Sequence, residues 1–249
     1  MNQREMREER RAARQAAERA ERIRDTRRKR LWRLGAAAGI AAILVAVVAA
    51  VSASGGPAKT LTKSTVVAGV QEHNGVLGNP NAPVTITEYV DLQCPVCAAA
   101  ARQTLPALVR DYVRTGKVRL EARTLQFIGP DSERAARFAA GAAQQNRLWP
   151  FLEAFYAAQG RENSGYVTDA FLRSVAHAAG VDADSALAQM NSAGAQAQLN
   201  RANADATTLG VDSTPTFTVA RTGGRAHVLA TGAQKPQALA AALDAELGR

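Results

Sequence analysis

The hydrophobic and polar positions divide this chain of 249 residues into three parts. Residues 1–33 mix Arg, Glu and Ala with almost no apolar periodicity. Residues 34–58 carry no ionisable side chain, and most of them are Ala, Val, Gly, Ile or Leu. From about residue 75, runs with the two-residue period of a strand take turns with runs that have the period of a helix. That order predicts a domain of the α/β class.

The apolar residues 34–54 are numerous enough to predict one helix across a bilayer. Five basic side chains precede them, namely Arg27, Arg28, Lys29, Arg30 and Arg33. Because basic segments stay on the cytoplasmic side, we expect residues 1–33 to form a cytoplasmic tail and the C-terminal domain to be extracytoplasmic. The expected location is the cell membrane, with a single span. A cleaved signal peptide is the alternative, since Val51-Ser52-Ala53 is an acceptable cleavage site.

The net charge of +9 belongs mainly to the predicted tail. Residues 1–33 hold 13 of the 31 Lys and Arg side chains and 6 of the 22 Asp and Glu side chains, a net charge of +7. The rest of the chain therefore carries only +2. This distribution does not predict a nucleic-acid-binding domain.

A flexible linker is predicted over residues 55–74, and a domain over residues 75–249. Within the domain, Val84–Val90 predicts a strand, Pro95 to about Arg114 a helix, and Val118–Arg123 a second strand. A strand, a helix and a strand in this order predict a parallel pair joined by a right-handed crossover.

Residues 131–209 predict a long block of helices, the first of which Ser132 and Glu133 are expected to cap. The later helices are expected over Leu148–Gln159, over Asp169–Ala179, after a cap at Asp182 or Asp184, and over Ala195–Leu209. The segment Gly210–Ala220, a turn at Gly223-Gly224, a strand over Ala226–Ala230 and a helix over Pro236–Leu247 complete the chain. Strands and helices are therefore expected to enclose a helical insertion.

The two cysteines of the chain, Cys94 and Cys97, lie three residues apart, where the first predicted strand passes into a helix. The N-terminus of a helix carries unpaired N–H groups and a partial positive charge, which favour the thiolate of Cys94. Pro95 suits the first helical turn because its missing donor is not needed there, and Val96 adds no charge. The pattern predicts a redox-active dithiol whose first cysteine is acidic and exposed.

A zinc site and a structural disulfide are the alternatives for this cysteine pair. Zinc normally takes four ligands in paired spacing, whereas His73, His177 and His227 are widely separated. A disulfide across two intervening residues closes a very small loop and removes little entropy from the unfolded chain. We therefore favour a redox role, with no metal ion and no cofactor.

Four separated features resemble the DsbA-like family of thiol–disulfide oxidoreductases, and they extend over roughly Gly75 to Leu247. They are Asp91-x-x-Cys94-Pro95-x-Cys97 after a strand, Ser132 after Gly129-Pro130, the helix with Trp149, Phe155, Tyr156 and Gln159, and the segment Gly210-Val211-x-Ser213-Thr214-Pro215-Thr216-Phe217. The resemblance implies a thioredoxin fold with a helical insertion at about residues 131–209.

The resemblance also implies that Thr214-Pro215 is a cis peptide packed against the dithiol. A proline at this place removes a backbone donor and stops local pairing. The backbone of Thr214 is then free to bind an extended substrate strand beside Cys94.

Glu88 resembles the buried acid that this fold places beneath the cysteine pair. It shares its alternation parity with Val84 and Ile86, which favours burial on their apolar face. A buried carboxyl has a raised pKa and could pass a proton to or from Cys97. We interpret the nearby Asp91 as a turn or cap residue.

These expectations favour an extracytoplasmic oxidase that forms disulfides in secreted proteins. Reduced or misoxidised proteins are the expected substrates, and the family implies a membrane quinone-linked partner that reoxidises the dithiol. Val96 stands where the strongest oxidants of the family carry histidine, which leaves the oxidising strength open. A reductase or isomerase for specific clients, or a membrane-anchored interaction module without enzymatic activity, are the alternatives.

Overall fold

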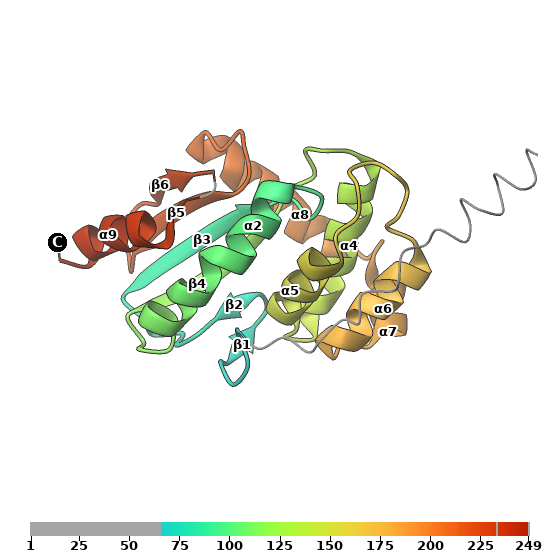
Figure 1. The fold of residues 1–249 in the computed structure, drawn as a ribbon, viewed down its shortest axis with the longest axis horizontal. Helices are drawn as coiled ribbons and strands as arrows, with labels where there is room; N and C mark the ends of the chain where they lie inside the picture. Colours follow the sequence, from blue (N-terminus) through green and yellow to red (C-terminus); the bar gives the residue numbers. More distant parts are fainter. Residues whose placement is uncertain (1–65, 233, 249) are drawn as a thin grey trace, which may run out of the picture. The chain divides into compact units, whose positions relative to one another are not determined.

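A computed structural model of the chain describes residues 66–232 and 234–248, and a six-stranded β-sheet forms its centre (Figure 1). The spatial order of the strands is β1-β2-β4-β3-β5-β6, with β3 and β4 parallel and the other neighbours antiparallel. The strands are β1 (Glu72–His73), β2 (Val76–Leu77), β3 (Val84–Val90), β4 (Val118–Thr124), β5 (Thr216–Arg221) and β6 (His227–Thr231). The predicted parallel pair is therefore present.

The segment between β3 and β4 is helical but is not the single helix that we predicted. It consists of α2 (Pro95–Gln103), α3 (Leu105–Leu108) and the π-helical turn η1 (Val109–Val113). The first break falls at Thr104, just before Pro106. Proline cannot donate a backbone hydrogen bond, and its ring crowds the carbonyl group four residues earlier, so a continuous helix is disfavoured here.

The helical insertion lies between β4 and β5 and gathers its first four helices beside one edge of the sheet (Figure 1). Its helices are α4 (Pro130–Gln144), α5 (Leu148–Ala158), α6 (Asp169–Ala179), α7 (Ala183–Gln189) and α8 (Ala193–Leu209). Phe138, Phe151 and Phe155 are fully buried, and the rings of Phe138 and Phe151 lie 5.1 Å apart. Aromatic burial thus supplies the core of the insertion. The helix α9 (Pro236–Leu247) has the predicted bounds.

The domain begins earlier than the predicted boundary at Gly75. Val67, which we placed in the flexible linker, is 4% exposed and belongs to the hydrophobic core. The Arg114 guanidinium donates hydrogen bonds to the carbonyl groups of Val66 and Ala68, and Glu72 lies in β1. Residues 66–74 are therefore part of the fold, because their apolar side chains have a place in its core.

The predicted tail 1–33, the predicted membrane span 34–54 and linker residues 55–65 lie outside the described residues. Within the described ranges, 66–232 and 234–248, none of the helices has both the length and the apolar character that a membrane crossing needs.

Candidate active site

Cys94 caps the N-terminus of α2, at the point where β3 has ended. Its sulfur accepts a hydrogen bond from the Cys97 backbone N–H at 3.4 Å, and its thiol donates to the Thr214 carbonyl at 3.4 Å. Both cysteines are free, and their exposed fractions are 6% for Cys94 and 0% for Cys97. Cys94 is thus the more accessible sulfur, but it is more covered than the exposed thiol that we predicted, because Thr214 lies against it.

The two sulfurs differ strongly in acidity. A hydrogen bond from the Cys97 thiol is the largest of the causes that lower the pKa of Cys94 to about 6. Burial opposes this shift, while the Thr214 side chain and the backbone N–H groups of Val96 and Cys97 support it. Burial, followed by the neighbouring Cys94 sulfur, raises the pKa of Cys97. Cys94 is therefore the more acidic thiol of the pair, and Cys97 is a buried thiol that keeps its proton.

The Thr214–Pro215 bond is cis, as the sequence resemblance implied. β5 begins at the next residue and pairs with β3, where Thr216 lies opposite Tyr89. This register brings Thr214 to the end of β3, beside the Cys94 sulfur. The predicted position of this peptide is confirmed, and its role in binding a substrate strand remains a prediction.

Glu88 is 5% exposed, which confirms the burial expected from the alternation of β3. Burial raises the pKa of Glu88 to about 8. The buried Tyr156 joins this acidic region, because its pKa is raised by burial and then by the charges of Cys97 and Glu88. Its hydroxyl donates to the Asp91 carbonyl at 3.3 Å. The transfer of a proton between Glu88 and Cys97 remains a prediction.

Asp91 does more than form the predicted turn. Its fully buried carboxylate does accept the Gln93 N–H at 2.8 Å, which is a turn contact. It also accepts the Ser132 hydroxyl at 2.6 Å and the N–H groups of Phe127 and Ile128 at 2.8 and 3.1 Å. Ser132 therefore does not cap α4 as we predicted, since the helix begins at Pro130 and this side chain points to Asp91.

Three amide side chains that the sequence did not identify as site residues complete the surroundings of Cys94. Gln93 donates to Ser132 and to Asn163, and accepts the Asn163 N–H at 2.6 Å. Gln159 donates to the carbonyl groups of Leu92 and Cys94. Gln93 borders the cysteine motif, and Gln159 lies in one of the segments that carry the family resemblance. No sequence pattern predicts their hydrogen bonds to residues 65 to 70 positions away. The helical insertion thus holds the Cys94 loop directly.

Gly129 lies against the side chain of Asn163. Its φ angle of 139° is one that side chains rarely adopt. A Cβ atom there would come within 2.5 Å of the Asn163 side-chain oxygen. Only glycine fits both conditions without moving Asn163.

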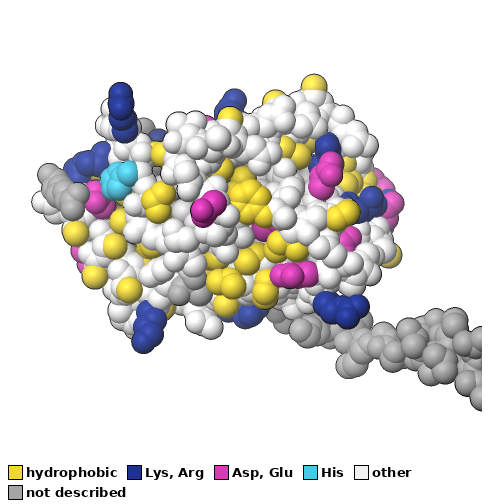
Figure 2. All heavy atoms as spheres, turned by 90° about the horizontal axis from the view of Figure 1, so that it is seen from above, with side chains coloured by type: hydrophobic (Ala, Val, Ile, Leu, Met, Phe, Trp, Pro, Cys, Tyr) yellow, Lys and Arg dark blue, Asp and Glu magenta, His cyan; other side chains and the backbone are white. Residues whose placement is uncertain are grey.

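The face around the start of α2 is hydrophobic. Pro95 is exposed, and the exposed fractions of Val96 and Phe127 are 40% and 50%. Figure 2 views the molecule from the end at which α2 begins, and hydrophobic side chains gather in the middle of this face while most Lys and Arg lie near its margin. Among the described residues, no group of three or more His, Cys, Asp or Glu side chains could hold a metal ion.

The profile of the thioredoxin family matches residues 71–245. The chain belongs to this family. It is 34% identical to the probable disulfide bond formation protein D of Bacillus anthracis over 103 residues, which are 40% of this chain and 46% of that protein. It is 28% identical to disulfide bond formation protein D of Bacillus subtilis over 122 residues, which are 47% of this chain and 55% of that protein. The chain spans about half the length of these relatives.

Solved structures share the fold over most of the domain. Oxidised BdbD from Bacillus subtilis superposes with a TM-score of 0.62 at 21% identity, covering 72% of this chain and 97% of that one. A thioredoxin-like oxidoreductase from Silicibacter pomeroyi gives 0.58 at 29% identity, with coverages of 70% and 92%. DsbA from Chlamydia trachomatis gives 0.58 at 17% identity, with coverages of 74% and 96%. The predicted DsbA-like thioredoxin fold is confirmed.

Proposed function

We propose that this protein is a thiol–disulfide oxidoreductase that exchanges disulfides with protein thiols through Cys94 and Cys97. The observation that carries the proposal is the geometry of the pair: the Cys94 sulfur caps α2 against Thr214, and Cys97 is fully buried. This arrangement lowers the pKa of Cys94 to about 6 and raises that of Cys97. The relatives named as disulfide bond formation proteins support it. The hydrophobic face around Val96 suits exposed apolar segments of an incompletely folded protein.

In the oxidising direction, the resting protein carries a Cys94–Cys97 disulfide. A substrate thiolate attacks the Cys94 sulfur, the Cys94–Cys97 bond breaks, and Cys97 leaves as a thiolate that takes up a proton. A second substrate thiolate attacks the substrate sulfur of the mixed disulfide and expels the Cys94 thiolate. Two electrons thereby pass from the substrate thiols to the dithiol, and the substrate gains a disulfide.

Each charged group has a part in these steps. The low pKa of Cys94 makes its thiolate a good leaving group in the second step. Cys97 is buried and retains a proton strongly, so its departure requires a proton donor nearby. Glu88, with a pKa of about 8, can give up a proton near neutral pH and is our proposed donor. The Thr214 backbone is the proposed contact for an extended substrate strand.

The oxidising direction is favoured because a stabilised Cys94 thiolate stabilises the dithiol form and raises the reduction potential. We further propose that the domain is extracytoplasmic, tethered by residues 34–54, and is reoxidised by a membrane quinone-linked oxidoreductase. The apolar stretch and its basic flank support the tether. Val96 between the cysteines supports the competing role of a reductase or isomerase, because valine cannot stabilise a thiolate as histidine can.

Redox assays of the wild type and of Cys94→Ser and Cys97→Ser test the proposal. We expect the oxidised wild type to reoxidise reduced RNase and Cys94→Ser to lose all exchange. In Cys97→Ser the Cys94 thiolate should attack a substrate disulfide, expel one substrate thiolate and accumulate as a mixed disulfide. A reduction potential near about −120 mV would support an oxidase, whereas one near about −270 mV would identify a reductase. A cellular phenotype that stays unchanged in Cys94→Ser would instead favour an interaction module.

A further inference from the structure

The proposed mechanism uses no side-chain atom of Asp91, although this carboxylate is fully buried three residues before Cys94. A buried carboxylate is costly unless donors satisfy it. Here four donors do so, and they come from two segments of the chain, the Cys94 loop and residues 127–132. Such a complete set of partners indicates a positioning task.

The side chain of Asp91 joins the Cys94 loop to the start of α4. One oxygen, Oδ1, accepts the N–H of Gln93 and the hydroxyl of Ser132. The other, Oδ2, accepts the N–H groups of Phe127 and Ile128, which lead into α4. Hydrogen bonds to an ionised group are stronger than neutral ones, so this junction is firmly held.

The main chain of Asp91 contacts the dithiol itself. Its carbonyl accepts the Cys94 N–H at 3.0 Å and the Tyr156 hydroxyl at 3.3 Å. Its backbone also forms a hydrogen bond with Cys97, which acts to lower the pKa of that thiol. The Asp91 backbone is therefore in contact with both cysteines.

We propose that Asp91 is a positioning residue for the dithiol: its carboxylate locks the Cys94 loop onto the start of α4 and so keeps the Cys94 sulfur against the N–H groups at the start of α2. This inference rests on the proposed function for its role in the cell. In physical terms, the acidity of Cys94 depends on the Asp91 side chain, which does not contact the Cys94 sulfur.

Asp91→Asn keeps the size of the side chain and removes the second acceptor. If the amide nitrogen occupies the Oδ2 position, it faces the N–H groups of Phe127 and Ile128. If it occupies the Oδ1 position, it faces the N–H of Gln93, while the Ser132 hydroxyl can turn and accept. Either way at least one buried N–H loses its acceptor, and the Cys94 loop loses a restraint.

The pH dependence of Cys94 alkylation in the reduced protein measures the consequence. We expect its midpoint to rise above the wild-type value near 6 in Asp91→Asn. A rise of about one pH unit would slow alkylation at about pH 6 roughly fivefold. Ser132→Ala should move the midpoint in the same direction by less, because three donors remain. The reduction potential should fall in the same order.

Glu133→Gln is the matched control, since Glu133 is the neighbour of Ser132 on α4 and pairs with Arg137 at the surface. Its midpoint should equal that of the wild type. Wild-type midpoints and potentials in folded Asp91→Asn and Ser132→Ala would overturn the proposal. If circular dichroism shows that Asp91→Asn does not fold, Ser132→Ala decides alone. Alkylation needs no turnover, so a wild type without exchange activity would sink the proposed function and still leave Asp91 testable.

Discussion

Glu88 at the dithiol end of the sheet and Glu72 at the β1 end are acidic side chains in different surroundings. Burial is the whole cause of the raised pKa of Glu88, about 8. Burial also raises the pKa of Glu72, to about 7, but three contacts oppose it. Its carboxylate accepts the N–H groups of Leu148 and Trp149 at 2.7 and 3.3 Å, and the charge of Arg147 lies nearby.

This difference separates Glu72, an acid with a structural role, from Glu88, an acid that is a candidate for proton transfer. Glu72 satisfies N–H groups at the first turn of α5, where the helix dipole favours negative charge. Its carboxylate therefore ties β1 to the helical insertion. For Glu88 no opposing contact lowers the pKa, so its ionised form lacks compensation in the fold. The charges of both Glu88 and Cys97 act on the buried Tyr156, so a buried acid with that property fits our proposed proton donor better than a structural link.

Glu88→Gln should have the largest effect on stability. A pKa that is raised in the folded state contributes stability that is complete below about pH 4.5 and is lost as the pH rises through about 8. At about pH 9 the substitution should therefore raise the free energy of unfolding by about 3–5 kcal/mol, at roughly 1.4 kcal/mol for each pKa unit. At about pH 4 the two proteins should be nearly equal.

Urea unfolding of the oxidised protein measures this effect, because the disulfide removes the titration of Cys94 and Cys97. Glu88→Gln should also slow thiol exchange near neutral pH if Glu88 supplies the proton for Cys97. Equal wild-type stability at about pH 5 and about pH 9 would contradict the assignment of a buried, titrating Glu88.

Glu72→Gln should have the same sign and a smaller size. The stability that Glu72 contributes is lost as the pH rises from about 4.5 through about 7, one pH unit below the range of Glu88. The free energy of unfolding should rise by about 1–3 kcal/mol at about pH 9. The gain is smaller than for Glu88→Gln because the amide replaces one acceptor of the Leu148 and Trp149 N–H groups by a donor. The midpoint of Cys94 alkylation should stay at its wild-type value.

The same unfolding series, run on both variants, tests this prediction. In Glu72→Gln the pH dependence that remains between about pH 7 and pH 8 should belong to Glu88. If Glu72→Gln instead loses the pH dependence of its stability above about pH 7, the pH ranges of Glu72 and Glu88 have been assigned to the wrong residues.

The alternation of β3 was enough to predict both its bounds and the burial of Glu88, since parity alone assigns a side chain to a face. The spacing of Cys94 and Cys97 after that strand predicted that Cys94 is the more acidic thiol. The contacts of Asp91 with Phe127 and Ser132 were beyond reach, because they join residues 36 and 41 positions apart and no periodicity encodes such pairs. Strand β1 has only two residues, which is too short for a pattern to appear.

Trp149→Phe tests the β1 end without changing any charge. The indole N–H donates to the Gly75 carbonyl at 2.9 Å, and Trp149 is almost fully buried. Losing this bond leaves a carbonyl group without that partner and should cost about 1–2 kcal/mol. The loss should be the same at about pH 5 and about pH 9, in contrast to the glutamate variants. A pH-dependent loss would mean that the indole and Glu72 act as one unit.

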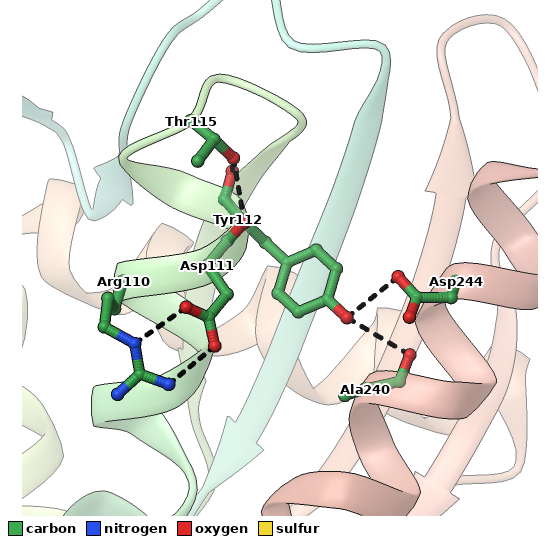
Figure 3. Close-up of polar contacts among 6 residues, drawn as sticks. All are labelled: Arg110, Asp111, Tyr112, Thr115, Ala240 and Asp244. Atoms are coloured by element: carbon green, nitrogen blue, oxygen red, sulfur yellow. Dashed lines mark hydrogen bonds and ion pairs between the residues drawn. The ribbon is translucent and has the colours of Figure 1, made fainter.

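Tyr112→Phe should have the smallest effect and serves as the reference for both ends. The Tyr112 hydroxyl donates to Asp244 at 2.9 Å and to the Ala240 carbonyl at 3.3 Å, which joins η1 to α9 (Figure 3). Its removal should lower the free energy of unfolding by about 1 kcal/mol. The pKa of Tyr112 is about 12, raised first by burial, so the loss should not vary between about pH 5 and pH 9.

The neighbouring Asp111 provides the matched control for Tyr112. Its pair with Arg110 is exposed, and Asp111→Asn should leave the stability close to that of the wild type. Figure 3 shows this pair and Tyr112 together. Because the partners of Tyr112 and Asp111 are Asp244, Ala240 and Arg110, none of which contacts Cys94, neither variant should move the Cys94 midpoint. A midpoint that shifts in Tyr112→Phe would show that the acidity of Cys94 depends on the whole domain, and the local account based on Asp91 and the start of α2 would then be too narrow.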